Sequence, residues 1–144
     1  MPISDDPRAL AGDLGGAVVR FSRRLRRERP EYADLSLSHL SALGSLERAG
    51  ALSPGELAAA ERVQPPSMSR IVARLVETGL VVRSAHPTDG RQAVLEVTDA
   101  GRALVAANRH AREAWLARQV EGLSPAQRDT LREAAALLEG LARS

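Results

Sequence analysis

Arginine side chains recur at two places in the middle of the chain. Their positions there would let each make two hydrogen bonds to one partner. Arg70 and Arg74 are one turn apart in a helical pattern over 66–78, and Arg91 stands in the polar segment 85–92. Arginine carries a planar fork of donors that matches the guanine edge in the DNA major groove and the oxygens of a phosphate. The chemistry that these residues favour is recognition of a nucleic acid.

The segment 66–78 has one apolar face and one polar face. The apolar residues recur at i, i+3, i+4 and i+7 and are Met68, Ile71, Val72 and Leu75. The opposite face consists of Ser67, Ser69, Arg70, Ala73, Arg74 and Glu77. Its small residues let a helix lie deep in a groove, and its free N-terminal amides suit a phosphate. Taken alone, the pattern also fits a surface helix with solvated arginines.

The segment 85–92 is polar and rich in turn-forming residues, and strand-like runs over 80–83 and 93–97 flank it. It is therefore expected to protrude as a hairpin with Arg91 at its tip, where an arginine can enter a narrow minor groove. Asp89 either pairs with an arginine and holds the tip or only forms the turn, and the sequence leaves both readings open.

Capping signals delimit the helices that must position these groups. A helix begins near Ser36 or Ser38 and ends at Gly50, and a capping box at 53–56 opens a short helix that ends near Arg62. The helix over 66–78 follows. Thr98 caps a long helix over 98–121, and a second capping box at 124–127 opens the last helix. Two short helices followed by a hairpin predict a winged helix-turn-helix.

The terminal helices carry leucine-rich stripes that the winged unit cannot cover. A helix is expected over 13–29, ended by Pro30, and the last helix has a stripe of Leu131, Ala134, Ala135, Leu138 and Leu141. Burying one leucine is worth about 1.5–3 kcal/mol, so such stripes need a partner, and a symmetric homodimer is predicted. The arginines between Arg20 and Arg29 form either a solvated face or a phosphate contact.

Composition narrows the class of protein further. The 144 residues have a formal net charge of +2, no cysteine and three aromatic residues, so a mainly α fold with a small β-hairpin wing is expected. Without cysteine there is no disulfide, thiol chemistry or Cys-based metal site. No apolar segment has membrane-spanning length, and a cytoplasmic location is expected. The three histidines lack ligand spacing and no phosphate-binding loop occurs, so neither an enzyme nor a cofactor is predicted.

The segments 35–46, 53–83, 87–104 and 123–131 resemble the MarR family of winged helix-turn-helix regulators. The resemblance implies an obligate dimer, a pseudo-palindromic double-stranded DNA operator and, often, release by a small phenolic or anionic ligand. It divides the single domain 1–144 into a dimerisation helix at 8–30, a winged unit at 35–101 and dimerisation helices at 102–144. Within the winged unit, the helix-turn-helix spans about 53–78 and the wing about 83–93.

The resemblance also implies which residues contact DNA. They are Pro66, Ser67, Ser69, Arg70, Arg74, Asp89 and Arg91. The chain departs from the family at Gln64, a weak N-cap where a small hydroxyl residue is common. The family's ligand pocket lies between the dimer helices and the winged unit. Phe21, His39 and Trp115 could line it, although none is assigned as a ligand residue.

The expected function is a repressor that a small ligand releases from its operator. A constitutive regulator or an activator has the same sequence features and stays open. A helical protein–protein adaptor would explain the leucine stripes but not the arginine-tipped hairpin, and salt-dependent binding to duplex DNA would separate the two.

Overall fold

The computed structural model describes residues 6–30, 32 and 35–144. The helices are α1 (Pro7–Leu25), α2 (Leu37–Ala49), α3 (Pro54–Glu61), α4 (Pro65–Glu77), α5 (Asp99–Glu121) and α6 (Pro125–Ala142). The strands are β1 (Ala51–Leu52), β2 (Val81–Ala85) and β3 (Ala93–Val97). This order confirms the mainly helical fold with a β-hairpin wing.

The winged unit has its own apolar core. Helices α2, α3 and α4 pack with a small antiparallel sheet in which β3 lies between β1 and β2. The largest fully buried side chains come from the three helices, from β3 and from the residue before β2, and are Leu43, Leu46, Leu57, Met68, Val72, Leu75, Leu80 and Leu95. Strand β1 was not predicted, because two residues are too few to show the alternation that identifies a strand.

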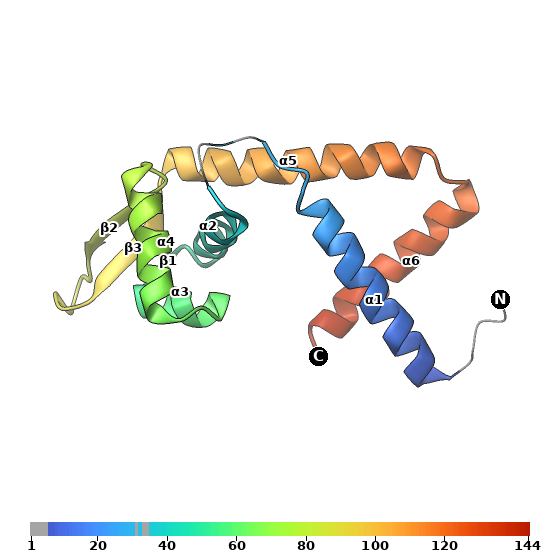
Figure 1. Cartoon of the computed structure of the whole chain (residues 1–144), viewed down its shortest axis with the longest axis horizontal. Helices are drawn as coiled ribbons and strands as arrows, with labels where there is room; N and C mark the ends of the chain where they lie inside the picture. Colours follow the sequence, from blue (N-terminus) through green and yellow to red (C-terminus); the bar gives the residue numbers. More distant parts are fainter. Residues whose placement is uncertain (1–5, 31, 33–34) are drawn as a thin grey trace.

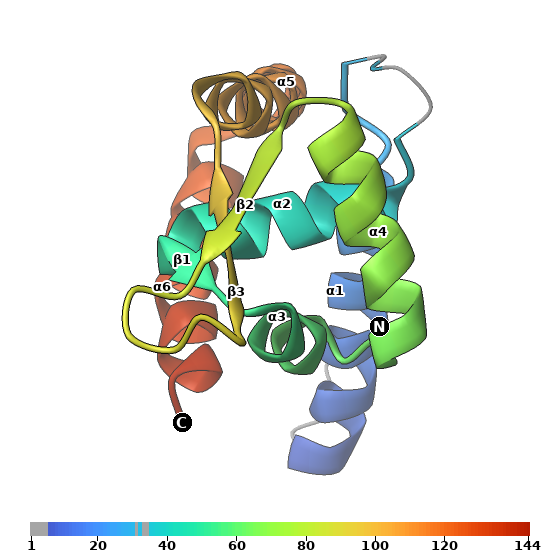
Figure 2. The ribbon, with the colours of Figure 1, turned by 90° about the vertical axis from the view of Figure 1, so that its left-hand side faces the viewer.

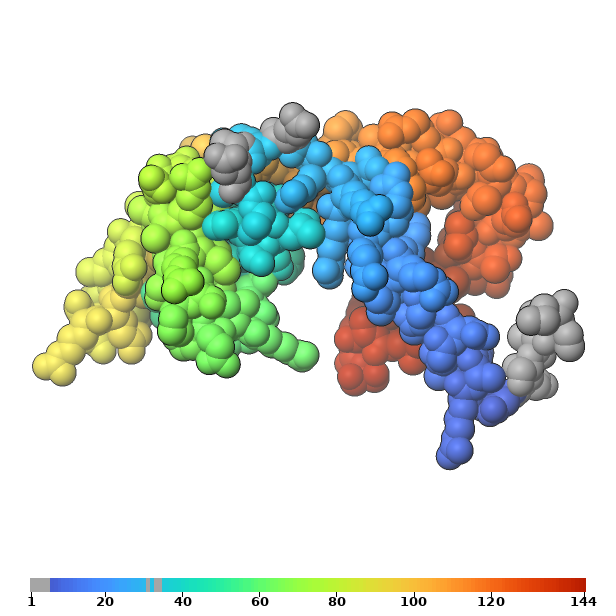
Figure 3. Space-filling view, in the orientation of Figure 1, coloured from blue at the N-terminus to red at the C-terminus, as the bar shows by residue number. Residues whose placement is uncertain are grey.

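Helix α5 leads away from the winged unit and joins it to α6 (Figure 1). The C-terminal end of α1 approaches α5 outside the winged unit, and in the view of Figure 1 the rest of α1 crosses α6. At the contact with α5, the Phe21 and Trp115 ring centroids are 6.3 Å apart and the Arg24 guanidinium lies 4.5 Å from the centre of the Trp115 ring. In the space-filling view, an open space separates the winged unit from α6 (Figure 3). No helix in the described residues is long and apolar enough to span a membrane.

Most predicted helix ends are confirmed, because side-chain caps set them. Ser53 and Ser124 form reciprocal capping boxes, Thr98 accepts from the Gly101 amide, and Gly50 ends α2 with a φ of 88°. The first helix differs from its prediction over 13–29. Asp6 caps it and Pro7 starts it, and it ends at Leu25, because the amides of Arg27 and Glu28 bond to carbonyls only three residues back.

Candidate nucleic-acid interface

Helix α4 has the buried face that its sequence predicts. Met68, Val72 and Leu75 are buried, and Ile71 is half-buried against the same core. At the N-terminus, Gln64 makes no side-chain cap, as its sequence suggested, and only its carbonyl accepts the Met68 amide at 3.0 Å. The first turn therefore depends on contacts elsewhere for its position.

The predicted reading face is exposed, except at Arg74. Pro66, Ser67, Ser69 and Arg70 are exposed, and the Ser69 hydroxyl donates to the Pro65 carbonyl at 3.0 Å. Arg74 is half-buried, with 33% of its side chain exposed, and its guanidinium lies 3.0 Å from the Glu77 carboxylate. Arg70 has no carboxylate within ion-pairing distance among the described residues. Arg70 is thus the more available of the two arginines.

His39 belongs to the N-terminus of α2. Its Nδ1 accepts from the Ser36 amide at 3.1 Å, while the Ser36 hydroxyl caps the helix by accepting the His39 amide. Burial lowers the pKa of His39, and the charge of Arg74 lowers it further. The imidazole thus serves as a helix cap beside the reading helix.

Side-chain to backbone bonds shape the wing tip. Asp89 Oδ1 accepts from the Arg91 amide at 3.1 Å, so among the described contacts its role is turn formation, one of the two readings left open by the sequence. The Nδ1 of His86 accepts from the amides of Thr88 and Asp89 at 3.2 and 3.1 Å. These bonds leave the side chain of Arg91 exposed at the tip.

The wing tip and the N-terminal end of α4 lie at the same edge of the winged unit (Figure 1, Figure 2).

Thr98 and Gly101, at the start of α5, join the winged unit to that helix. The Thr98 hydroxyl donates to the Gly79 carbonyl at 2.7 Å, and the Thr98 amide donates to the Leu80 carbonyl at 3.0 Å. These two bonds attach the start of α5 to the residues that connect α4 with β2.

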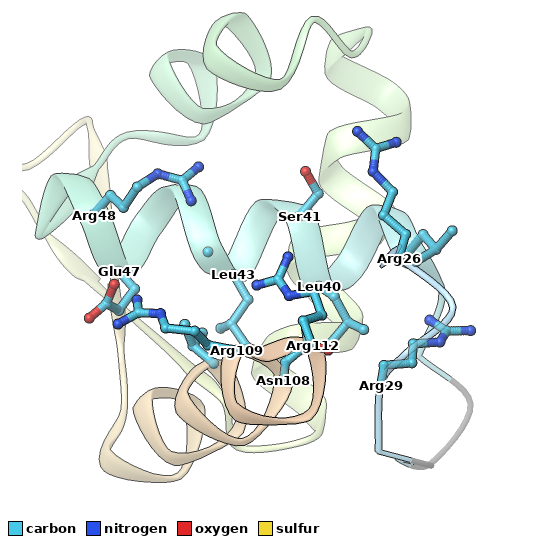
Figure 4. A pocket seen from close by; sticks show the side chains of 13 residues that line it. Arg26, Arg29, Leu40, Ser41, Leu43, Glu47, Arg48, Asn108, Arg109 and Arg112 are labelled. Carbon is cyan, nitrogen blue, oxygen red and sulfur yellow. The ribbon is translucent and has the colours of Figure 1, made fainter. Parts of the chain in front are cut away.

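A pocket of about 360 Å³ lies between α2, α5 and the segment that directly follows α1 (Figure 4). Its basic lining consists of Arg26, Arg29, Arg48, Arg109 and Arg112, and Glu47 is the one carboxylate among the described residues that line it. None of these five guanidiniums is within ion-pairing distance of a carboxylate in the described part of the chain. The Asn108 Oδ1 atom is buried in the lining without a hydrogen-bond donor.

Comparisons with known proteins agree with this geometry. The MarR family profile matches residues 33–92. A helix-turn-helix-type transcriptional regulator of Mycobacterium tuberculosis is 48% identical over 137 residues, which is 95% of each chain. The chain belongs to the MarR family.

Solved structures extend the likeness to almost the whole MarR-family chain. A candidate transcriptional regulator of Pseudomonas aeruginosa has a TM-score of 0.84 and 34% identity, over 98% of this chain and 99% of its own. FabT of Streptococcus pneumoniae, crystallised in complex with DNA, has a TM-score of 0.64 and 16% identity over 94% of each chain, a likeness of fold alone. The protein is thus a winged helix-turn-helix, DNA-binding regulator of transcription.

Sequence reasoning missed two features of this MarR-family protein, the arginine-lined pocket and the role of His86 in the wing turn. Phe21, His39 and Trp115 do not line the pocket, because the two rings contact each other and the histidine caps α2. The pocket arginines were missed because three separate segments supply them. The turn-forming role of His86 was detectable, since it lies in a short polar turn. That of Asp89 was one of the two readings that the sequence left open.

Proposed function

We propose that the protein represses transcription by binding a pseudo-palindromic operator as a homodimer, and that a small anion releases it. Residues Pro66, Ser67, Ser69, Arg70 and Arg74 would face the major groove, with Asp89 and Arg91 beside them at the wing. The observation that carries the proposal is the edge that the N-terminal end of α4 shares with the wing tip (Figure 2). Arg70 of α4 and Arg91 of the wing are both exposed. The DNA complex of FabT, which has the same fold, supports it.

Arg70 and Arg91 have different expected roles in DNA binding. Arg70 lies in the N-terminal half of α4, the part of a recognition helix that reaches base edges. Arg91 is held at the wing tip by the Asp89 turn and would enter the adjacent minor groove. The side chain of Arg74 is half-buried and shares one of its nitrogens with Glu77, so we assign it a smaller share of the affinity.

The uncovered apolar residues of α1 and α6 support the homodimer. Neither helix contains a buried residue in the single chain. The exposed apolar side chains on these two helices are Leu10, Leu14, Val18, Val19, Phe21, Leu131, Leu137, Leu138 and Leu141. A second copy of the chain would cover them and would place two winged units on two half-sites.

The arginine-lined pocket is the proposed effector site. Its volume is within the range of small-molecule sites, and its unpaired guanidiniums suit a carboxylate or a similar anion. The buried Asn108 Oδ1 lacks a donor, which a ligand hydroxyl could supply. A phenolic carboxylate such as salicylate combines both groups.

Arg70→Ala tests the reading assignment. The operator is first selected from random duplex DNA with the wild-type chain, and affinity is then measured by fluorescence anisotropy. We expect the favourable free energy of operator binding to fall by about 1–3 kcal/mol, because a bidentate hydrogen-bonded contact between an arginine and a base contributes about that much. Arg118→Ala is the matched control for the lost charge, because Arg118 is exposed on α5. This variant should bind the operator almost as wild type does. Equal affinities for Arg70→Ala and Arg118→Ala would refute the assignment.

Arg112→Ala tests the effector site. Salicylate is titrated into the preformed protein–operator complex, and the concentration that releases half of the DNA is compared between variants. We expect the variant to need about tenfold more salicylate, since a hydrogen bond between charged groups contributes about 1.5–3 kcal/mol. Arg118→Ala, on the same helix outside the pocket, should respond as wild type. An unchanged midpoint for Arg112→Ala would remove salicylate from this pocket.

A further inference from the structure

The Glu61 carboxylate joins the end of α3 to α2. Its Oε2 accepts from the Ser41 hydroxyl at 2.6 Å, and its Oε1 accepts from the Ser45 hydroxyl. Ser41 and Ser45 are one turn apart on α2, so their hydroxyls reach the two carboxylate oxygens together. This double contact fixes where α3 ends relative to α2.

The position of Glu61 in the chain gives that contact its importance. Glu61 is the last residue of α3, and Arg62 follows in the left-handed region with a φ of 54°. Helix α4 begins three residues later, at Pro65, and its N-cap residue Gln64 makes no side-chain bond. The start of the reading helix therefore depends on the turn that Glu61 anchors.

Two donors in this network also line the arginine-lined pocket. Arg48 donates to the Ser45 hydroxyl oxygen at 3.1 Å, and both Arg48 and Ser41 are pocket residues. A serine hydroxyl has one proton, so Ser41 can donate either to Glu61 or to a bound anion, but not to both. An anion that draws Arg48 away also removes the donor that polarises the Ser45 hydroxyl and strengthens its bond to Glu61.

We propose that Glu61 is the positioning residue through which the pocket controls the reading helix. In the free protein, Ser41 and Ser45 hold Glu61 and the α3–α4 turn in the DNA-binding arrangement. A pocket anion competes with Glu61 for the Ser41 proton and for Arg48, and the turn loses its anchor. The inference rests on the DNA-binding function and the effector site proposed above.

A double-mutant cycle on the full-length chain tests the connection without any ligand. Operator affinity is measured for wild type, Arg48→Ala, Glu61→Ala and the double variant. We expect Glu61→Ala to weaken binding about tenfold and Arg48→Ala about threefold, since both remove charged hydrogen bonds. The double variant should bind no more weakly than Glu61→Ala, because coupled residues act through one path. Multiplicative losses, or no loss in Glu61→Ala, would overturn the proposal.

Salicylate provides the second readout, which a purely structural role of Ser41 would not change. We expect Ser41→Ala to bind the operator more weakly than wild type without ligand, because Glu61 loses one of its two serine donors. It should still bind salicylate by calorimetry, but its operator affinity should respond to salicylate less than that of wild type, because only the path through Arg48 and Ser45 remains. Ser38→Ala is the matched control, because Ser38 is exposed on the same helix and makes no described hydrogen bond. A full response in Ser41→Ala, or no response in wild type, would overturn the link between pocket and turn.

Folding and DNA reading are checked separately. Melting curves must show that Glu61→Ala and Glu113→Ala, an exposed carboxylate control on α5, remain folded at the assay temperature. If Arg70→Ala has no effect on operator affinity, the DNA-reading assignment itself fails. If Arg70→Ala weakens binding while the cycle is multiplicative, only the connection through Glu61 fails.

Discussion

Replacing Gly101 with alanine is expected to lower the free energy of unfolding by about 3 kcal/mol, at the upper end of the cost of overpacking. Gly101 lies in the first turn of α5, against Leu80 just before β2 and Val97 at the end of β3. A Cβ atom built there would lie 2.3 Å from the Leu80 carbonyl oxygen and 2.6 Å from Val97 Cγ1. The Leu80 oxygen is backbone and already accepts from the Thr98 amide, so it cannot move without breaking that bond.

The effect is measured by thermal unfolding followed with circular dichroism. We expect the melting temperature of Gly101→Ala to be roughly 10 °C below that of wild type. Gly140→Ala is the matched control, because Gly140 lies inside α6 and nothing is within 4 Å of its added Cβ. Alanine should raise stability there by up to about 1 kcal/mol, the usual helix preference over glycine. Equal melting temperatures for wild type and Gly101→Ala would show that the close contact is relieved at no cost.

Placing aspartates at Leu137 and Leu141 is expected to separate the homodimer. These side chains are 70% and 63% exposed in the single chain and stand one turn apart on α6. Burying two carboxylates in an apolar interface without partners costs more than the interface can recover. Each monomer would then bind one half-site, and operator affinity should fall by about 100-fold or more, since joining two binding modules gains about 10²–10⁴.

Light scattering gives the oligomeric state, and anisotropy with the selected operator gives the affinity. The matched control is Ala136→Asp, which introduces one aspartate on the opposite, exposed face of α6. It should remain dimeric and bind DNA as wild type does. A Leu137→Asp/Leu141→Asp chain that stays dimeric would exclude this face of α6 as the interface. A wild-type monomer in solution would remove the two-half-site proposal altogether.

Local signals predicted the ordered elements well. The Ser53 and Ser124 capping boxes and the Gly50 terminus act within four residues, so the sequence alone locates those helix ends. The start of α1 was misplaced because its Asp6 cap lies before a stretch with weak apolar periodicity. Strand β1 exists only because β3 pairs with it across 42 intervening residues, from Leu52 to Leu95.

The sequence by itself determined the winged helix-turn-helix, the buried face of α4 and the protruding wing, because periodicity and caps depend on near neighbours. Only the tertiary structure decided which polar groups meet. It leaves Arg70 exposed and brings Ser41 and Ser45 of α2 to Glu61 of α3. It also gathers the pocket arginines from three segments. Such contacts depend on how the helices pack, which no local spacing in the sequence encodes.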